Sequence, residues 1–325
     1  MTTDALTASG VPVDLPTQAD ARPAGPGVAT IGLALASAAA FGMSGSLATA
    51  LLRSGWSPAA AVTARIGLAA LVLAGPTVWS LRGRWHLLRR KALAILVYGL
   101  TGVAGCQLAY FNAVQHLSVG VALMLEYLSP VLLVLGFWAW TRRRPATHTI
   151  AGTLVCIGGL ALVLDVFGGA RLSVVGVLWG LGAAACSAAY FVIAGRADDD
   201  LPPLALAGVG MAVGAVALCL LGVAGVLPMH ATTADTTFAG QHVPFWLPLV
   251  ALAVISTAFA YFTGVIAARG LGRTIASFVA LAEVLFSVVF AWLLLGQLPL
   301  AIQLLGGLLI VGGVVLVRLG ELRSL

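Results

Sequence analysis

Charged residues are scarce in this chain. Aspartate, glutamate, lysine and arginine together make up 9% of its 325 residues, whereas 61% are hydrophobic, and the mean hydropathy is +1.07. An average soluble domain has about a quarter of its residues charged. The composition therefore excludes a soluble globular protein and predicts an all-α polytopic membrane protein, with the lipid bilayer as its main surroundings.

Cysteines are few, and several motifs of catalysis are missing. The four cysteines lie in apolar runs without a CxxC or Cys/His cluster, which argues against a disulfide framework or a zinc site. No GxxxxGK[ST] loop, HExxH helix or Ser/His/Asp set occurs. We therefore expect no cofactor and no metal, and a membrane enzyme is disfavoured. The basic pI of 9.6 does not indicate nucleic-acid binding, because the basic residues lie between hydrophobic segments.

The first 28 residues differ from the rest. They hold three aspartates, four prolines and a single arginine, with no apolar core of the signal-peptide type. We expect 1–28 to be a disordered cytoplasmic tail without a cleaved leader, and 318–325 to be a short cytoplasmic tail.

Ten apolar segments follow that tail, each about 17 to 24 residues long and thus able to cross the ~30 Å hydrocarbon core as a helix. They are 30–51, 58–80, 92–114, 119–140, 149–166, 174–195, 204–227, 245–267, 274–295 and 300–317. Short joins with turn residues separate them. The segments group into two units of five helices, 29–166 and 174–317.

Lysine and arginine indicate the orientation. If both termini are cytoplasmic, fourteen basic residues fall on the inner side and only Arg53 and Arg171 on the outer side, with Arg65 inside a helix. This strong positive-inside bias predicts a multi-pass protein of the cell (inner) membrane with both termini in the cytoplasm.

The two units look like copies of one another. An offset of 154 residues (292 − 138) pairs Trp138 with Trp292 and Pro145 with Pro299. The same offset repeats a G-x5-GG pattern, Gly152, Gly158 and Gly159 against Gly306, Gly312 and Gly313. Because five is odd, the second copy enters the membrane from the opposite side. The sequence thus predicts an inverted repeat, the arrangement that lets one binding site face either side in turn.

Charged residues inside the segments are candidate site residues, because a charge in hydrocarbon is costly. Arg65 and Glu126 each lie seven residues from the outer end of their helix, about 10 Å deep, so the two could form an ion pair if their helices are neighbours. A static structural pair, or an arginine that snorkels to the interface, is the alternative. Glu126 also precedes Ser129 and Pro130, a helix break that we expect to act as a hinge.

Glu283 lies near the middle of the ninth segment, where desolvation favours its protonated form. The repeat offset pairs it with Ser129, so the two acids lie one helical turn apart on related helices. We expect them to line a shared cavity and to exchange protons. Weaker candidates for solute contact, which could equally serve as interhelical hydrogen-bonding groups, are Gln107, Tyr110, Asn112 and Tyr261.

The chain resembles the EamA-type members of the drug/metabolite transporter superfamily over about residues 30–317. VALMLEYLSPVLL, with Glu126, is similar to the acidic fourth helix of RhtA-like amino-acid exporters, and Arg65 in AVTARIGLAALVLAG matches an arginine common in the family. The run STAFAYFTGVIAARGLGRTIASFVALAEVLFSVVFAWLLLGQ is similar to the family's second-repeat signature. Two positions depart from that pattern: Val284 stands where the family has proline, and Gln297 where it has glutamate.

The resemblance implies a secondary active transporter that exports small metabolites, such as amino acids of the threonine/homoserine type, by alternating access, coupled to protons or by exchange. The alternatives are a multidrug or other metabolite permease of the same fold and, less favoured, a non-transporting membrane scaffold or sensor. The inverted repeat and the intramembrane acids favour transport independently of the resemblance.

Overall fold

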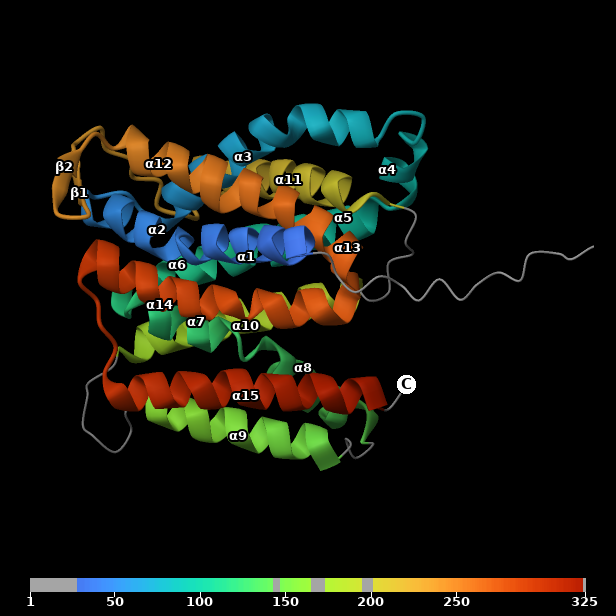
Figure 1. Ribbon diagram of the computed structural model, residues 1–325. Coiled ribbons are helices and arrows are strands. Elements are labelled where there is room, and N and C mark those ends of the chain that lie inside the picture. The colour runs from blue at the N-terminus through green and yellow to red at the C-terminus, as the bar shows by residue number, and fades with distance from the viewer. Residues whose placement is uncertain (1–27, 143–146, 165–172, 195–200, 324–325) are drawn as a thin grey trace, which may run out of the picture.

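The computed structural model describes residues 28–142, 147–164, 173–194 and 201–323 and is almost entirely helical (Figure 1). The tail predicted over 1–28 lies outside the described residues except for Val28, which begins the first helix. The last helix continues to Arg323, beyond the boundary expected at 317.

The first half of the chain contains α1 (Val28–Gly42), α2 (Ser44–Arg53), α3 (Pro58–Ser80), α4 (His86–Arg90), α5 (Ala92–Val97), the π-helix η1 (Tyr98–Gly105), α6 (Cys106–His116), α7 (Val119–Glu126), α8 (Ser129–Thr141) and α9 (Thr147–Val163). The second half contains α10 (Val174–Ala194), α11 (Pro203–Val223), β1 (Thr236–Phe238), β2 (Gln241–Val243), α12 (Trp246–Ala253), the π-helix η2 (Val254–Phe259), α13 (Ala260–Ala280), α14 (Ala282–Leu295) and α15 (Ala301–Arg323).

Within the described residues, each of the predicted apolar segments coincides for most of its length with helix, and the seventh stops early because α11 ends at Val223. Six spans in the described residues are long and apolar enough to cross a membrane: Val28–Arg53, Pro58–Ser80, Ala92–His116, Val119–Trp140, Pro203–Val223 and Trp246–Leu271. Four shorter apolar helices account for the other segments: Thr147–Val163, Val174–Ala189, Ala282–Leu295 and Ala301–Val317. Large apolar side chains such as Leu71 and Trp140 are 73% and 90% exposed, which suits a surface that faces lipid rather than water. The protein is a multi-pass membrane protein.

Several of these spans are interrupted. Tyr127 and Leu128 separate α7 from α8, with Pro130 in the first turn of α8, so the break expected beside Ser129 is present. The turn at Leu281 separates α13 from α14, although Val284 replaces the family's proline there. Leu281 lies 154 residues after Tyr127. The two breaks therefore occur at positions that the repeat offset relates, and the second forms without proline.

The ninth predicted segment begins differently from the expectation. The sequence predicts separate helices over 245–267 and 274–295, but α13 continues through the expected turn to Ala280. The eighth segment is also not uniform, because η2 interrupts it between α12 and α13. The third segment contains η1 in the corresponding place. Short π-helical insertions in α-helices occur often at functional sites.

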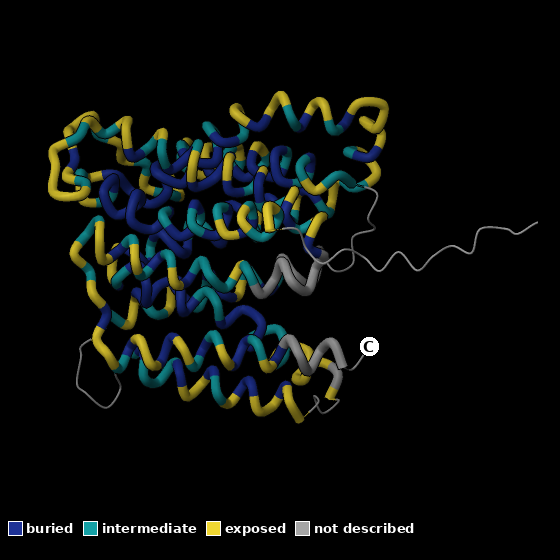
Figure 2. The backbone as a smooth tube through the Cα atoms, in the orientation of Figure 1, coloured by how far each residue is buried: buried dark blue, intermediate teal, exposed yellow. Residues whose placement is uncertain are grey.

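Buried residues are concentrated where the helices meet in the middle of the bundle (Figure 2). At one edge α9 and α15 lie side by side as an outlying pair (Figure 1). Their backbones nearly touch: a Cβ placed on Gly152 would lie 2.6 Å from the carbonyl oxygen of Gly313, and a Cβ on Gly306 would lie 2.6 Å from that of Gly159. Adding the repeat offset to Gly152 and Gly159 gives Gly306 and Gly313, so the two contacts are related by the repeat. Because Gly152 meets Gly313 and Gly159 meets Gly306, the two helices run antiparallel.

The loop between α11 and α12 is hydrogen-bonded to the turn between α2 and α3. Ser57 caps α3 by accepting a hydrogen bond from the Ala60 amide (3.2 Å), and its hydroxyl lies 2.6 Å from the Pro228 carbonyl oxygen. The indole of Trp56 donates to the Thr232 carbonyl oxygen at 2.8 Å. The hairpin β1–β2 belongs to this loop, which gives one end of the bundle an ordered cover.

The described chain begins and ends at the opposite end of the bundle from this hairpin (Figure 1). The basic helix α4 lies at that end as well. Start, end and basic segment therefore share one face of the membrane protein, as the predicted topology requires.

Candidate functional site

Arg65 is the largest side chain in the bundle that is fully buried, at 1% exposure. Its Nε donates to Oγ1 of Thr257 at 2.6 Å, and its Nη2 lies 3.3 Å from the carbonyl oxygen of Ser256. Its Nη1 donates to Oε1 of Gln107 at 2.7 Å. The ring centroid of Phe111 lies 5.5 Å from the guanidinium carbon. The arginine of α3 therefore joins η2 and α6, and does not snorkel to an interface.

The π-helix η2 explains why this contact forms. A π-helical turn displaces backbone carbonyls from the regular i to i−4 pattern, which leaves oxygen atoms available to other donors. The Ser256 carbonyl takes that role toward Arg65, while the Thr257 hydroxyl donates onward to the Leu252 carbonyl at 2.8 Å. The Ser256 hydroxyl is buried and has no partner among the described residues. The residue whose carbonyl contacts the buried cation thus has a hydroxyl left without a partner among the described residues.

Glu126 is the last residue of α7 and stands at the break before α8. The thiol of Cys106, from α6, donates to its Oε1 at 3.2 Å. Because a thiol is a weak donor, this contact satisfies the carboxyl group only weakly. The break also leaves Ser129 and Pro130 at the start of α8, where Ser129 is buried at 4% exposure.

Glu283 is the second residue of α14, next to the turn at Leu281. The hydroxyl of Tyr127 lies 2.9 Å from its Oε2 and 3.0 Å from the Ala280 carbonyl oxygen. Tyr127 directly follows Glu126 in the chain. The broken helices α7–α8 and α13–α14 are therefore joined at their breaks by a tyrosine that links the neighbourhoods of the two acids.

The ion pair considered for Arg65 and Glu126 is not formed in this structure. Every hydrogen bond that Arg65 makes within the described residues goes to a neutral oxygen. Glu126 and Glu283 are bonded instead to Cys106 and Tyr127. The site thus holds one buried cation and two partly buried acids, each hydrogen-bonded to neutral partners.

The remaining candidates divide into two groups. Gln107 contacts Arg65 directly, whereas the side-chain amide of Asn112 donates to the Leu108 carbonyl of its own helix at 2.7 Å. Tyr261 packs edge-on against Phe41, with ring centroids 5.0 Å apart. Gln107 is therefore directly hydrogen-bonded to Arg65.

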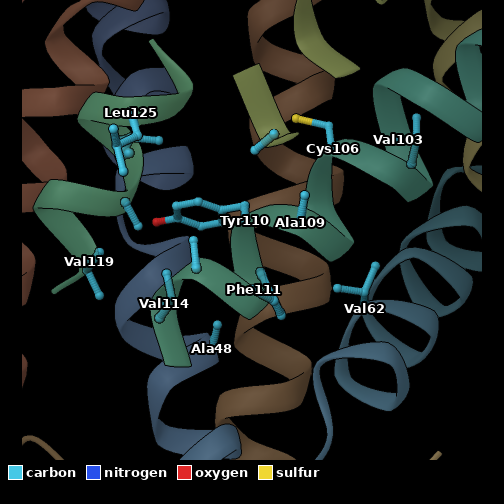
Figure 3. Close-up of a cluster of buried hydrophobic side chains, with 14 of the residues drawn as sticks. Ala48, Val62, Val103, Cys106, Ala109, Tyr110, Phe111, Val114, Val119 and Leu125 are labelled. Carbon is cyan, nitrogen blue, oxygen red and sulfur yellow. The ribbon is translucent and has the colours of Figure 1, made fainter. Parts of the chain in front are cut away.

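Tyr110 lies deep in the apolar core. Figure 3 shows its ring extending from α6 toward the segment that carries Val119 and Leu125. The hydroxyl occupies the space that a Cβ on Gly45 would need, so the glycine admits it. Tyr110 therefore places a hydroxyl beside the backbone of α2, near the point where α1 and α2 are interrupted.

Several contact residues escaped the sequence analysis. Ser256 and Thr257 appear in the sequence only as small polar residues in an apolar run, and Cys106 as a buried thiol. Tyr127 is noticeable only because it follows Glu126. Gln297 accepts a hydrogen bond from the Val119 amide at 3.1 Å and so caps α7 from the second half of the chain. The departure from the family's glutamate thus keeps an oxygen acceptor in that place.

The family model for EamA-like transporters matches residues 28–165 and again residues 174–319. The chain belongs to the EamA-like transporter family. It is 28% identical over 239 residues to YicL, an inner membrane transporter of Salmonella typhimurium, covering 72% of this chain and 76% of that one. It is 28% identical over 247 residues to the threonine/homoserine exporter RhtA of Salmonella typhimurium, covering 74% and 75%. A crystal structure with 22% sequence identity matches 90% of this chain and 98% of its own, with a TM-score of 0.56, and shows a shared fold.

Proposed function

We propose that this EamA-family transporter is a secondary active transporter that exports small metabolites, amino acids of the threonine/homoserine type above all, by alternating access. The observation that carries the proposal is the Tyr127–Glu283 contact, which joins two broken helices inside an apolar bundle. Broken helices and intramembrane acids are the features from which solute and proton sites of transporters are built. RhtA, a threonine/homoserine exporter, supports the substrate class.

In many transporters alternating access is built from two halves of opposite orientation, and we propose that residues 29–166 and 174–317 are such halves, with five membrane helices each. The reciprocal contacts Gly152–Gly313 and Gly159–Gly306 support this arrangement, since they bring corresponding antiparallel helices together. The basic helix α4 supports a cytoplasmic location for the bundle end where the described chain begins and ends.

Movement of one half against the other would change the Tyr127–Glu283 contact, because Tyr127 belongs to the first half and Glu283 to the second. A protonated carboxyl group and a carboxylate differ in charge and in hydrogen-bonding capacity. We propose that Glu283, Glu126 or both bind a proton in one orientation and release it in the other. The proton then moves opposite to the exported solute, or solutes are exchanged.

Export is tested in cells that lack or contain the protein, by measuring extracellular amino acids and tolerance to toxic compounds. The proposal predicts that threonine or homoserine accumulates outside only when the protein is present. Substituting Glu126→Gln or Glu283→Gln should lower this export and remove its dependence on external pH, since glutamine mimics the protonated acid and cannot release a proton. Increased drug tolerance without amino-acid export would favour the multidrug alternative. Wild-type export by both variants would contradict the role of the acids.

A further inference from the structure

The unusual feature of Arg65 is a fully buried positive charge that makes no hydrogen bond to a carboxylate among the described residues. A buried charge is costly unless an opposite charge and hydrogen bonds compensate it. Within the described residues, Thr257, Ser256 and Gln107 supply three neutral acceptors. A guanidinium has five N–H groups, so two of them have no acceptor there. The two acids that could compensate the charge are bonded elsewhere, to Cys106 and Tyr127.

A second observation concerns Ser256, whose backbone carbonyl contacts this cation. The Ser256 hydroxyl is fully buried and has no hydrogen-bond partner among the described residues, while the carbonyl oxygen of the same residue lies 3.3 Å from Nη2 of Arg65. A buried hydroxyl without a partner costs free energy unless a ligand satisfies it. Arg65 and Ser256 together thus offer unused donors, and the group that fits them is a hydrogen-bond acceptor with a negative charge.

A comparable contact elsewhere in the bundle contains no arginine. Arg65 lies seven residues after Pro58, at the start of α3, where it reaches η2. Gly210 lies seven residues after Pro203, at the start of α11, and a Cβ on Gly99 of η1 would be 2.6 Å from its carbonyl oxygen. Both α3 and α11 begin with proline and pack on a π-helical segment. At the corresponding position of the two helices, α3 has arginine and α11 has glycine. The charge is therefore an addition that packing alone does not explain.

We propose that Arg65 and the Ser256 hydroxyl form the subsite that holds the carboxylate of the transported solute. This inference rests on the proposed transport function and restricts its substrates to carboxylates. Arg65 supplies the charge and up to two N–H groups, in the forked geometry that suits carboxylates, and Ser256 supplies a third donor. Glu126 and Glu283 supply negative charge for the ammonium group of an amino acid. The subsite explains why a cation and two acids occur together in the same apolar bundle.

The test is competitive counterflow in proteoliposomes loaded with L-threonine. The competitors are L-threonine, L-threoninamide, which has no carboxylate, and 1-amino-2-propanol, which lacks the group altogether. We expect threonine to compete at least about tenfold better than either analogue, because charge-assisted hydrogen bonds are lost in both. Arg65→Gln should abolish this preference, and Arg65→Lys should keep part of it. Ser256→Ala should raise the half-saturating concentration about tenfold with little change in the maximal rate.

Thr101→Ala is the matched control, because Thr101 lies in η1 and its hydroxyl already bonds to the carbonyl oxygen of Val97, the last residue of α5, at 2.7 Å. It should behave as the wild type. Size-exclusion profiles establish that each variant is folded, and if Arg65→Gln fails to fold, Arg65→Lys and Ser256→Ala still decide the question. Equal competition by all three compounds in the wild type, or an unchanged preference in the folded variants, would overturn the carboxylate subsite while leaving transport intact.

Chloride could occupy an anion subsite instead of the solute. Repeating the wild-type assay with methanesulfonate in place of chloride separates the two sources. Undiminished threonine counterflow without chloride supports the solute carboxylate. Loss of counterflow in methanesulfonate, together with equal competition by threoninamide in the chloride buffer, would identify chloride as the bound anion and overturn the proposal. If no compound in the panel drives counterflow in either buffer, the proposed transport function itself is wrong, and the inference falls with it.

Discussion

The helices α3 and α11 pack against the two π-helical segments of the molecule in different ways. Between α3 and η2 the contact is polar, and Arg65 bonds to both Ser256 and Thr257. Between α11 and η1 the contact is dry, and Gly99 approaches the Gly210 backbone closely. The two proposed halves thus share a backbone arrangement but not its chemistry. We therefore assign the glycine contact to the stability of the fold and the polar contact of Arg65 to the proposed binding of a solute.

Close glycine contacts also join α9 and α15. We call the α11–η1 and α9–α15 contacts the close-packed seams, and the residues around Arg65, Glu126 and Glu283 the polar centre. In hydrocarbon, helices associate through close backbone approach, and small residues permit it. Buried charge adds cost rather than stability. Substitutions in the seams should therefore reduce the amount of folded protein, while substitutions in the polar centre should reduce transport and leave the fold intact.

The largest expected effect is at Gly210. In Gly210→Ala the new methyl group would collide with the Tyr98 ring, and the α11–η1 seam would have to open. We expect almost no folded protein by fluorescence-detected size exclusion. Gly67→Ala is the control, because the nearest atom to its Cβ, on Ala215, is 3.7 Å away. Equal yields of the two variants would contradict the dry-seam account.

The α9–α15 seam should respond next. Gly152→Val would press into the Gly313 backbone and destabilise the folded state by about 1–3 kcal/mol, visible as a lower melting temperature in detergent. Gly158 lies on the same helix, but a Cβ placed on it has no atom within 4 Å, so Gly158→Val should melt like the wild type. A melting temperature in Gly152→Val as high as in Gly158→Val would show that this seam is looser than described.

On the polar side, Tyr127→Phe removes the hydroxyl that contacts Glu283 and keeps the ring. The melting temperature should stay within a few degrees of the wild type, and the transport rate should fall about tenfold, since a hydrogen bond to a charged group contributes about 1.5–3 kcal/mol. Thr49→Val is the control, because its hydroxyl bonds within its own helix, to the Gly45 carbonyl. Full transport by Tyr127→Phe would remove the contact from the mechanism.

The smallest expected effect is at Gln297, which caps α7 from the far half. Gln297→Ala should lower stability by about 0.5–2 kcal/mol, as loss of other helix caps does. Gln297→Glu should retain stability, because a carboxylate accepts the same hydrogen bond and suits the positive end of the helix. Thermal melts of the three proteins compare them directly, and a Gln297→Glu variant less stable than Gln297→Ala would contradict the capping role.

The sequence was sufficient for the approximate positions of the apolar segments, the family and the break beside Ser129, while the roles of Arg65, Glu126 and Glu283 remain predictions. Composition and hydropathy carry that information locally. The partners of those charges could not be predicted. Whether Glu126 meets Arg65 or Cys106 depends on how each helix is rotated about its axis, which neighbouring helices determine. The π-helices were also missed, because an added residue in a helical turn leaves little trace in an apolar run. The break at Leu281 forms without the proline that would have indicated it.

The most direct test of the account is the pH dependence of threonine counterflow in proteoliposomes, measured for the wild type, Glu126→Gln, Glu283→Gln and the seam control Gly158→Val. The account predicts that the wild type and Gly158→Val exchange threonine with the same pH dependence, and that at least one of the two folded glutamine variants loses that dependence. Threonine exchange by both glutamine variants with the rate and pH profile of the wild type, or no exchange by the wild type, would contradict it.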